Sequence, residues 1–133
     1  MGAEGARHRR GLILDSGALI AYERADRRVR GVIRLALERG DEVHVPAGVV
    51  GQVWRDGSRQ ARLARFLRAP QVTVDPLDER DARAAGVLCG RAGTTDVVDA
   101  SVVIVARRHR APVVTSDPED LARLDPGIEV HRC

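Results

Sequence analysis

The segment that most constrains this chain is residues 94–121, which reads as an acidic turn, a buried helix, a short apolar strand and a second acidic turn. Asp96 and Asp99 are three residues apart where the helix is expected to begin, so they share one helical face. The helix continues with apolar residues nearly all round, as in an element packed under a sheet. Residues 112–115 then form an apolar run typical of a buried strand, and Asp117 follows.

The start of the chain repeats this pattern. Residues 11–14 are an apolar run of buried-strand type that ends at Asp15. In an open parallel sheet, ligand sites form outside the carboxyl ends of the strands, where the helices begin. We therefore expect Asp15, Asp99 and Asp117 to approach one point, with Asp96 beside them. Asp96, Asp99 and Asp117 also have an ordinary explanation as helix-capping residues.

The rest of the chain alternates between strand and helix patterns, which predicts an α/β domain with a parallel sheet of four to five short strands and helices on both faces. Strands are expected at residues 11–14, 42–46, 72–75, 112–115 and 127–130. Helices are expected at residues 18–22, 29–37, 78–90 and 118–124. Three further helices are expected to begin at residue 47, at residue 58 and at residues 96–99. Ser58 can cap the second of these, which runs to about residue 68, and the third ends before Ala111. Residues 1–10 are interpreted as a loose tail, and residues 11–133 as a single domain.

Composition narrows the class of protein. A length of 133 residues suits one domain, and 44% hydrophobic residues with 2% aromatics predict an aliphatic core. No apolar run reaches the roughly 18 residues of a membrane span. All 22 basic residues are arginine, against 19 acids, and this balance is compatible with nucleic acid binding.

The cysteines and histidines carry less information. Cys89 and Cys133 have no CxxC spacing, so we expect free thiols in a reducing, cytoplasmic setting. The histidines are scattered along the sequence, so no histidine metal site is expected. They are His8, His44, His109 and His131.

Clustered carboxylates repel one another unless a hard divalent cation lies among them. Mg²⁺ accepts a few protein carboxylates, keeps several waters and meets phosphate oxygens, which is the chemistry of phosphodiester hydrolysis. The sequence contains neither the phosphate-binding pattern GxxxxGK[ST] nor the dinucleotide pattern GxGxxG, so nucleotide-binding folds have no support.

Three stretches resemble the PIN-domain ribonucleases, in particular the toxins of VapBC-type toxin–antitoxin pairs. They are LILDSGALIAY (12–22), VVDASVVIVARRHRAPVVTSDPEDLARL (97–124) and GIEVH (127–131). The resemblance implies a three-layer PIN-like fold and a Mg²⁺- or Mn²⁺-dependent endoribonuclease that is held inactive by an antitoxin. It also implies a homodimer.

The resemblance assigns roles to individual residues. Asp15 matches the first acid of the family, Asp99 the acid that opens the long helix, and Asp117 the last acid, so these three are the expected metal ligands. Ser16 and Ser116 match small hydroxyl positions beside the acids and are expected to support the metal's water shell.

The chain departs from the family at the second acid, which is usually a glutamate. The matching segment, VPAGVVGQVWRDG (45–57), offers Gln52, whose amide supplies neither charge nor a base. Asp96 would restore the missing charge in a working catalytic site. Alternatively, the site is weakened and the chain binds RNA or a partner without cutting. Glu23 and Asp56 are further candidates for the missing acid.

Two surfaces are candidate binding faces. Arg55, Arg59 and Arg62 belong to the densest basic stretch and are candidate RNA contacts, because arginine binds phosphate in a bidentate manner. The alternative is a solvated helix face, with Arg55 paired to Asp56 or Asp15. An antitoxin groove is expected near the N-terminal helices. Its candidate residues are Leu19, Tyr22 and Trp54, although packing in the core is the favoured alternative for Leu19 and Trp54.

Overall fold

The computed structural model describes residues 11–133, and the tail expected at residues 1–10 lies outside the described residues. The strands are β1 (Gly11–Leu14), β2 (Glu42–Pro46), β3 (Val72–Asp75), β4 (Val113–Thr115) and β5 (Val130–Arg132). The helices are α2 (Ser16–Glu23), α3 (Arg27–Glu38), α4 (Ala47–Val53), α5 (Ala61–Leu67), α6 (Glu79–Ala92), α7 (Val97–His109) and α8 (Pro118–Leu124).

The strands form one sheet in the order β3-β2-β1-β4-β5, and every neighbouring pair is parallel. This confirms the predicted α/β class and parallel sheet. The chain leaves β1 toward β2 on one side and later returns to pair β4 on the other side. The carboxyl ends of β1 and β4 therefore border the switch point, where parallel α/β sheets bind ligands.

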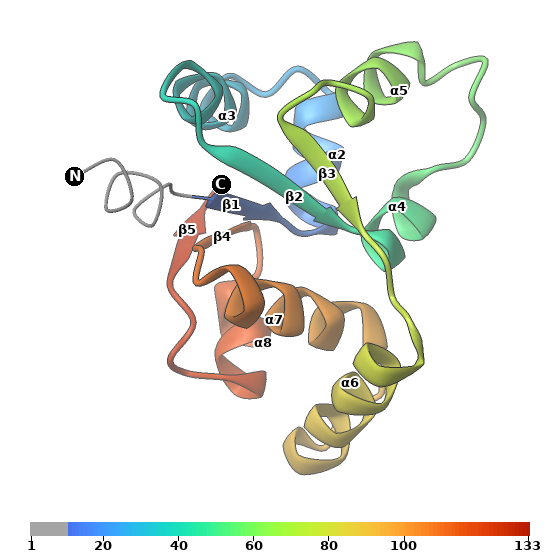
Figure 1. Cartoon of the computed structure of the whole chain (residues 1–133), viewed down its shortest axis with the longest axis vertical. Coiled ribbons are helices and arrows are strands. Elements are labelled where there is room, and N and C mark those ends of the chain that lie inside the picture. Colours follow the sequence, from blue (N-terminus) through green and yellow to red (C-terminus); the bar gives the residue numbers. More distant parts are fainter. Residues whose placement is uncertain (1–10) are drawn as a thin grey trace.

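Helices cover both faces of the sheet, as Figure 1 shows. α2, α3 and α5 pack on one side of it, while α7 and α8 lie on the other. α7 lies between the sheet and α6, which explains why its sequence is apolar nearly all round. β1 lies at the centre of the sheet, and its Ile13 and Leu14 are fully buried.

Two predicted elements begin later than expected. Ser58 does not cap a helix, because its N–H and hydroxyl both donate to Asp56 Oδ1, at 3.0 and 2.7 Å, and α5 begins only at Ala61. The final strand does not begin at Gly127. The Gly127 N–H donates to Asp125 Oδ1 at 2.9 Å, which makes a turn and delays β5 to Val130.

Cys89 and Cys133 are free thiols, as expected. Within residues 11–133, no helix has the length and apolar character needed to cross a membrane.

Candidate functional site

Asp15 lies at the carboxyl end of β1 and caps α2. Its Oδ1 accepts the Ala18 N–H at 2.9 Å, and the Thr115 hydroxyl donates to the same carboxylate. Only 6% of Asp15 is exposed. Burial raises the pKa of Asp15 and the charge of Asp117 raises it further, although the hydrogen bonds act in the opposite direction. A cation beside Asp15 would compensate this buried charge.

Asp117 lies at the carboxyl end of β4. The Thr115 hydroxyl, which donates to Asp15, accepts the Asp117 N–H at 2.9 Å and so links the two acidic strand ends. Asp117 occupies the N-cap position of α8, but its side chain makes no capping hydrogen bond. Capping therefore does not account for the exposed Asp117 carboxylate, which can serve a ligand.

Asp96 and Asp99 lie at the start of α7. Asp96 is a cap, because its Oδ1 accepts the Asp99 N–H at 2.9 Å. The half-buried Asp99 has its pKa raised to about 7, first by burial, then by Asp96, and further by the charges of Asp15 and Asp120. Acids from three different elements therefore act on one carboxyl group.

Asp120 belongs to this group of acids, and the sequence reasoning missed it. It lines a small pocket of about 100 Å³ together with Asp96 and Asp99. Asp120 follows Asp117 by three residues, which is the spacing that separates Asp96 from Asp99. The repeated spacing at two helix starts is the signal that would have identified it.

Gln52 lies beside the acidic strand ends. The Ser16 hydroxyl donates to Gln52 Oε1 in a short hydrogen bond that joins α2 to α4. The two further candidates for the missing acid lie elsewhere: Glu23, at the opposite end of α2, accepts from Gln60 Nε2 at 2.8 Å. Asp56 is bound to Ser58, and this lowers its pKa. Neither of them replaces the glutamate.

The three candidate RNA-binding arginines are exposed and have local partners. Arg55 Nη1 donates to the carbonyls of Gly51 and Trp54, at 3.2 and 2.7 Å, rather than pairing with Asp56 or Asp15. Arg59 Nε lies 3.9 Å from an oxygen of Asp56, and Arg62 donates to the Glu23 carbonyl at 3.3 Å. Each guanidinium has five donors, so these contacts leave most of them available for phosphate.

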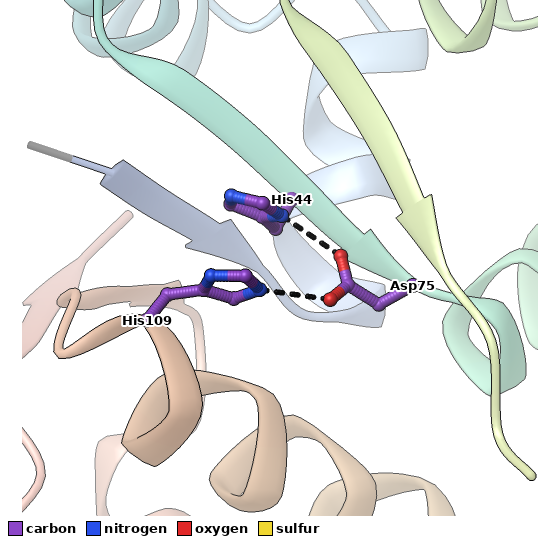
Figure 2. A group of neighbouring side chains, drawn as sticks. All are labelled: His44, Asp75 and His109. Atoms are coloured by element: carbon purple, nitrogen blue, oxygen red, sulfur yellow. Dashed lines mark hydrogen bonds and ion pairs between the residues drawn. The ribbon is translucent and has the colours of Figure 1, made fainter.

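Two of the histidines that are scattered in the sequence lie side by side in the fold, although no histidine metal site was expected. Figure 2 shows His44 of β2 and His109 of α7 on the two carboxylate oxygens of Asp75, which ends β3. Two signals were present in the sequence: a histidine in the middle of the otherwise apolar run VHVP, and another strand that ends at an aspartate. The sheet order needed to bring them together was not visible.

The fold and the acidic cluster define a class: a parallel α/β domain whose carboxylates gather at the carboxyl ends of β1 and β4 and at the start of α7. Residues 12–126 match the PIN domain as a sequence family, and the chain belongs to that family.

Solved structures share this fold. One is a chain of VapBC2 from Rickettsia felis bound to a DNA fragment from their promoter, with a TM-score of 0.68, 15% identity, and coverage of 92% of this chain and 98% of that one. A second is a chain of FitAB bound to the IR36 DNA fragment, with a TM-score of 0.63, 17% identity, and coverage of 91% of this chain and 94% of that one. A third is a chain of FitAcB from Neisseria gonorrhoeae, with a TM-score of 0.61, 20% identity, and coverage of 90% of this chain and 95% of that one. No curated protein matches the chain in sequence.

Proposed function

We propose that this PIN-domain protein is a Mg²⁺- or Mn²⁺-dependent endoribonuclease, the toxin of a type II toxin–antitoxin pair. The observation that carries the proposal is a gathering of acids from several elements in a PIN domain. Asp99 lines one small pocket with Asp96 and Asp120, and the charge of Asp117 acts on the buried Asp15. Acids held this close to one another are stabilised by a divalent cation.

The donor set fits such an ion. Asp15, Asp99 and Asp117 offer only carboxylate oxygens, which Mg²⁺ and Mn²⁺ prefer, and Ser16 and Ser116 add hydroxyl groups for the ion's water shell. When bound, such an ion activates a water and neutralises charge that develops on the phosphate.

The remaining residues position these groups. Asp96 holds the first turn of α7, and with it Asp99, through its capping bond. We assign Asp96 and Asp117 to holding the ion or orienting the attacking water, beside the direct ligands Asp15 and Asp99. The hydroxyl of Ser16 occupies Gln52 Oε1, which leaves the Gln52 amide N–H groups to donate to a water or a phosphate oxygen.

The experiment is cleavage of a labelled RNA pool by purified protein with Mg²⁺, Mn²⁺ or EDTA. We expect cleavage that needs the metal and is lost in both Asp99→Ala and Asp15→Asn, while circular dichroism shows that both variants remain folded. Glu38→Gln, an exposed acid on α3, is the matched control and should cut normally. Cleavage that survives Asp15→Asn would contradict the assignment of the site.

A second candidate function is a PIN-fold module that binds RNA or a protein without cutting. Gln52 favours it, because an amide stands where the family usually has a glutamate and neither Glu23 nor Asp56 replaces that acid. A folded protein that binds RNA but cuts it in neither metal would support this function over the nuclease.

An antitoxin is the proposed partner. A groove of about 630 Å³ is lined by residues of α2 and α3, among them Tyr22, Arg30 and Ile33. The Arg30 guanidinium lies over the Tyr22 ring, 4.9 Å from its centroid, so the groove combines a positive charge with apolar surface, which suits an amphipathic segment that carries acidic residues. Of the other expected groove residues, Leu19 is fully buried and Trp54 packs against the core. The homodimer and the cytoplasmic location are parts of the same proposal.

A further inference from the structure

We propose that His44, Asp75 and His109 form a second metal site, for Zn²⁺ or a similar transition-metal ion. This inference goes beyond the proposed nuclease function and does not depend on it. Asp99 and His109 are ten positions apart on α7, a distance of about 15 Å along the helix. The histidine site and the acidic site therefore lie toward opposite ends of α7.

The ligand atoms already converge. His44 Nδ1 lies 2.8 Å from Asp75 Oδ1, and His109 Nε2 lies 2.8 Å from Asp75 Oδ2. One possible ligand atom from each of the three residues lies within 4.8 Å of the other two. Ligands of a tetrahedral Zn²⁺ lie about 3.4 Å apart, given Zn–N and Zn–O bonds of about 2.1 Å. Small side-chain rotations would therefore admit the ion.

The three residues come from separate elements that meet at one edge of the sheet. His44 lies within β2, Asp75 ends β3, and His109 ends α7, as Figure 2 shows. The two imidazole rings stack, with centroids 3.6 Å apart and an angle of 18° between their planes. Bound metal would thus fasten the end of α7 to the β2–β3 edge.

Burial and access suit a bound ion. His44 is 4% exposed and Asp75 6%, so the donors are largely removed from water. The His109 side chain is 26% exposed, which gives an ion a path from solvent. Two histidines and one carboxylate also match the three-ligand sets that leave one Zn²⁺ position open.

Outer groups orient the ligands. Glu42 Oε1 lies 3.2 Å from His44 Nε2, so the ring nitrogen that faces away from the site contacts a carboxylate. Metal-binding histidines usually donate their second N–H to such a group, which fixes the tautomer and the ring orientation. On the other side, Arg108 Nη1 lies 3.8 Å from Asp75 Oδ2 and Nη2 bonds Asp81.

The donor set predicts which metal binds. Both ring nitrogens of His44 face carboxylates, so a positive charge at this place is stabilised. Imidazole suits Zn²⁺, Ni²⁺ and Cu²⁺, whereas carboxylate-rich sets suit Mg²⁺ and Mn²⁺. The histidine site should therefore prefer Zn²⁺ strongly over Mg²⁺, whereas the acidic site accepts Mg²⁺. The competing explanation is that protons on the imidazole rings supply the positive charge. In that case no ion binds, and the three residues form only a hydrogen-bonded network.

The test is calorimetric titration of the full chain with Zn²⁺, with Co²⁺ absorption as a second readout of imidazole ligation. With Mg²⁺ in excess to occupy the acidic site, we expect one equivalent of tightly bound Zn²⁺ in the wild type and its loss in His109→Gln, whose partly exposed position makes it the safer variant for folding. His131→Gln, an exposed histidine on β5, is the matched control and should bind normally. Glu42→Gln should weaken Zn²⁺ binding by about 10- to 100-fold.

Two outcomes would overturn the proposal. Equal Zn²⁺ binding by the wild type and His109→Gln would place the ion elsewhere. No Zn²⁺ binding by the wild type, with nitrogen NMR showing protons on both ring nitrogens of His44, would leave a hydrogen-bonded network only. Asp99→Asn should keep the Zn²⁺ site, which separates this result from any failure of the nuclease proposal. RNA cleavage is not a readout here.

Discussion

Asp99 is the residue whose surroundings most alter its chemistry. Burial and the nearby acids raise its pKa to about 7, so at neutral pH the carboxyl group is close to half-protonated. Folding therefore works against ionisation of Asp99, and a divalent cation at this position would displace a proton as it binds.

Asp99→Asn should stabilise the metal-free protein at alkaline pH. Between about pH 4, the usual value for an unfolded aspartate, and pH 7, the folded wild type binds the additional proton, so its stability falls as pH rises and then levels off. Asparagine carries no such charge. Because Asp99 is half-exposed and solvent screens the charge, we expect a gain of about 1–2 kcal/mol at pH 8. Urea unfolding in EDTA at pH 8 measures it.

The same comparison near pH 4 should show little difference between Asp99→Asn and the wild type. Glu38→Gln is the control, because it removes an exposed acid of α3 and should change stability little at either pH. An Asp99→Asn protein no more stable than the wild type at pH 8 would mean that neither burial nor the neighbouring acids disfavour the charge of Asp99.

Gln52→Glu tests whether the departure from the family weakens metal binding. The new carboxylate would still accept the Ser16 hydroxyl and would add a negative charge beside Asp15. We expect tighter Mn²⁺ binding by calorimetry and lower stability without metal. Gln52→Ala is the control that removes the contact without adding charge. Equal, tight Mn²⁺ affinity in Gln52→Glu and the wild type would show that Gln52 does not weaken the site and would count against the binding-only module.

At the scale of elements, two turns hold the acidic strand ends together. The first turn of α2, which follows β1 directly, contains Gly17, and the turn from β4 to α8 contains Ser116. A Cβ added at Gly17 would lie 2.1 Å from Ser116 Oγ and 3.2 Å from its Cβ. Glycine is therefore required here by the close approach of the two turns that carry Asp15 and Asp117.

Gly17→Ala should force Ser116 to rotate and the two turns to separate slightly, at a cost of about 1–3 kcal/mol. Thermal unfolding measures this cost, and the double variant Gly17→Ala/Ser116→Gly should recover most of it. Gly86→Ala on α6 is the control, because its added Cβ meets nothing within 4 Å. That change should stabilise the protein by up to about 1 kcal/mol. A Gly17→Ala protein as stable as the wild type would show that the turns adapt without cost.

The sequence predicted elements well where local pattern decides them. The run at 11–14 and the helix at 118–124 match β1 and α8, because apolar run length and a proline at the helix start are local signals. Ser58 does not act as a cap because its hydroxyl bonds Asp56 in a turn and α5 begins only at Ala61, with Gln60 at the N-cap position. The contact of His44 with His109 depends on the order of strands and the path of α7, which no local pattern contains.

At the scale of the whole molecule, α2 and α4 connect the basic surface to the acidic cluster. Ser16 begins α2, and Arg62 donates to Glu23, the last residue of that helix. Gln52 lies on α4, and Arg55 bonds back to the carbonyl of Gly51 in the same helix. An RNA strand bound to these arginines would therefore lie along the elements that border the proposed cleavage site.

Replacing Arg55, Arg59 and Arg62 together by glutamine should weaken RNA binding and reduce its salt dependence. Each phosphate contact to single-stranded nucleic acid contributes about 0.7 to the slope of log affinity against log salt, so the slope should fall by about 2. Binding of an uncleaved RNA to the Asp99→Ala background, measured by fluorescence anisotropy across salt concentrations, gives this slope without interference from cutting.

The control removes the same charge from another surface, by replacing Arg80, Arg83 and Arg91 of α6 with glutamine. If the arginines near α5 contact phosphate, only their triple variant lowers the slope. If both triple variants lower it equally, net charge alone attracts RNA and no defined surface is involved. If neither changes it, these arginines form a solvated face, and RNA reaches the acidic cluster by another route.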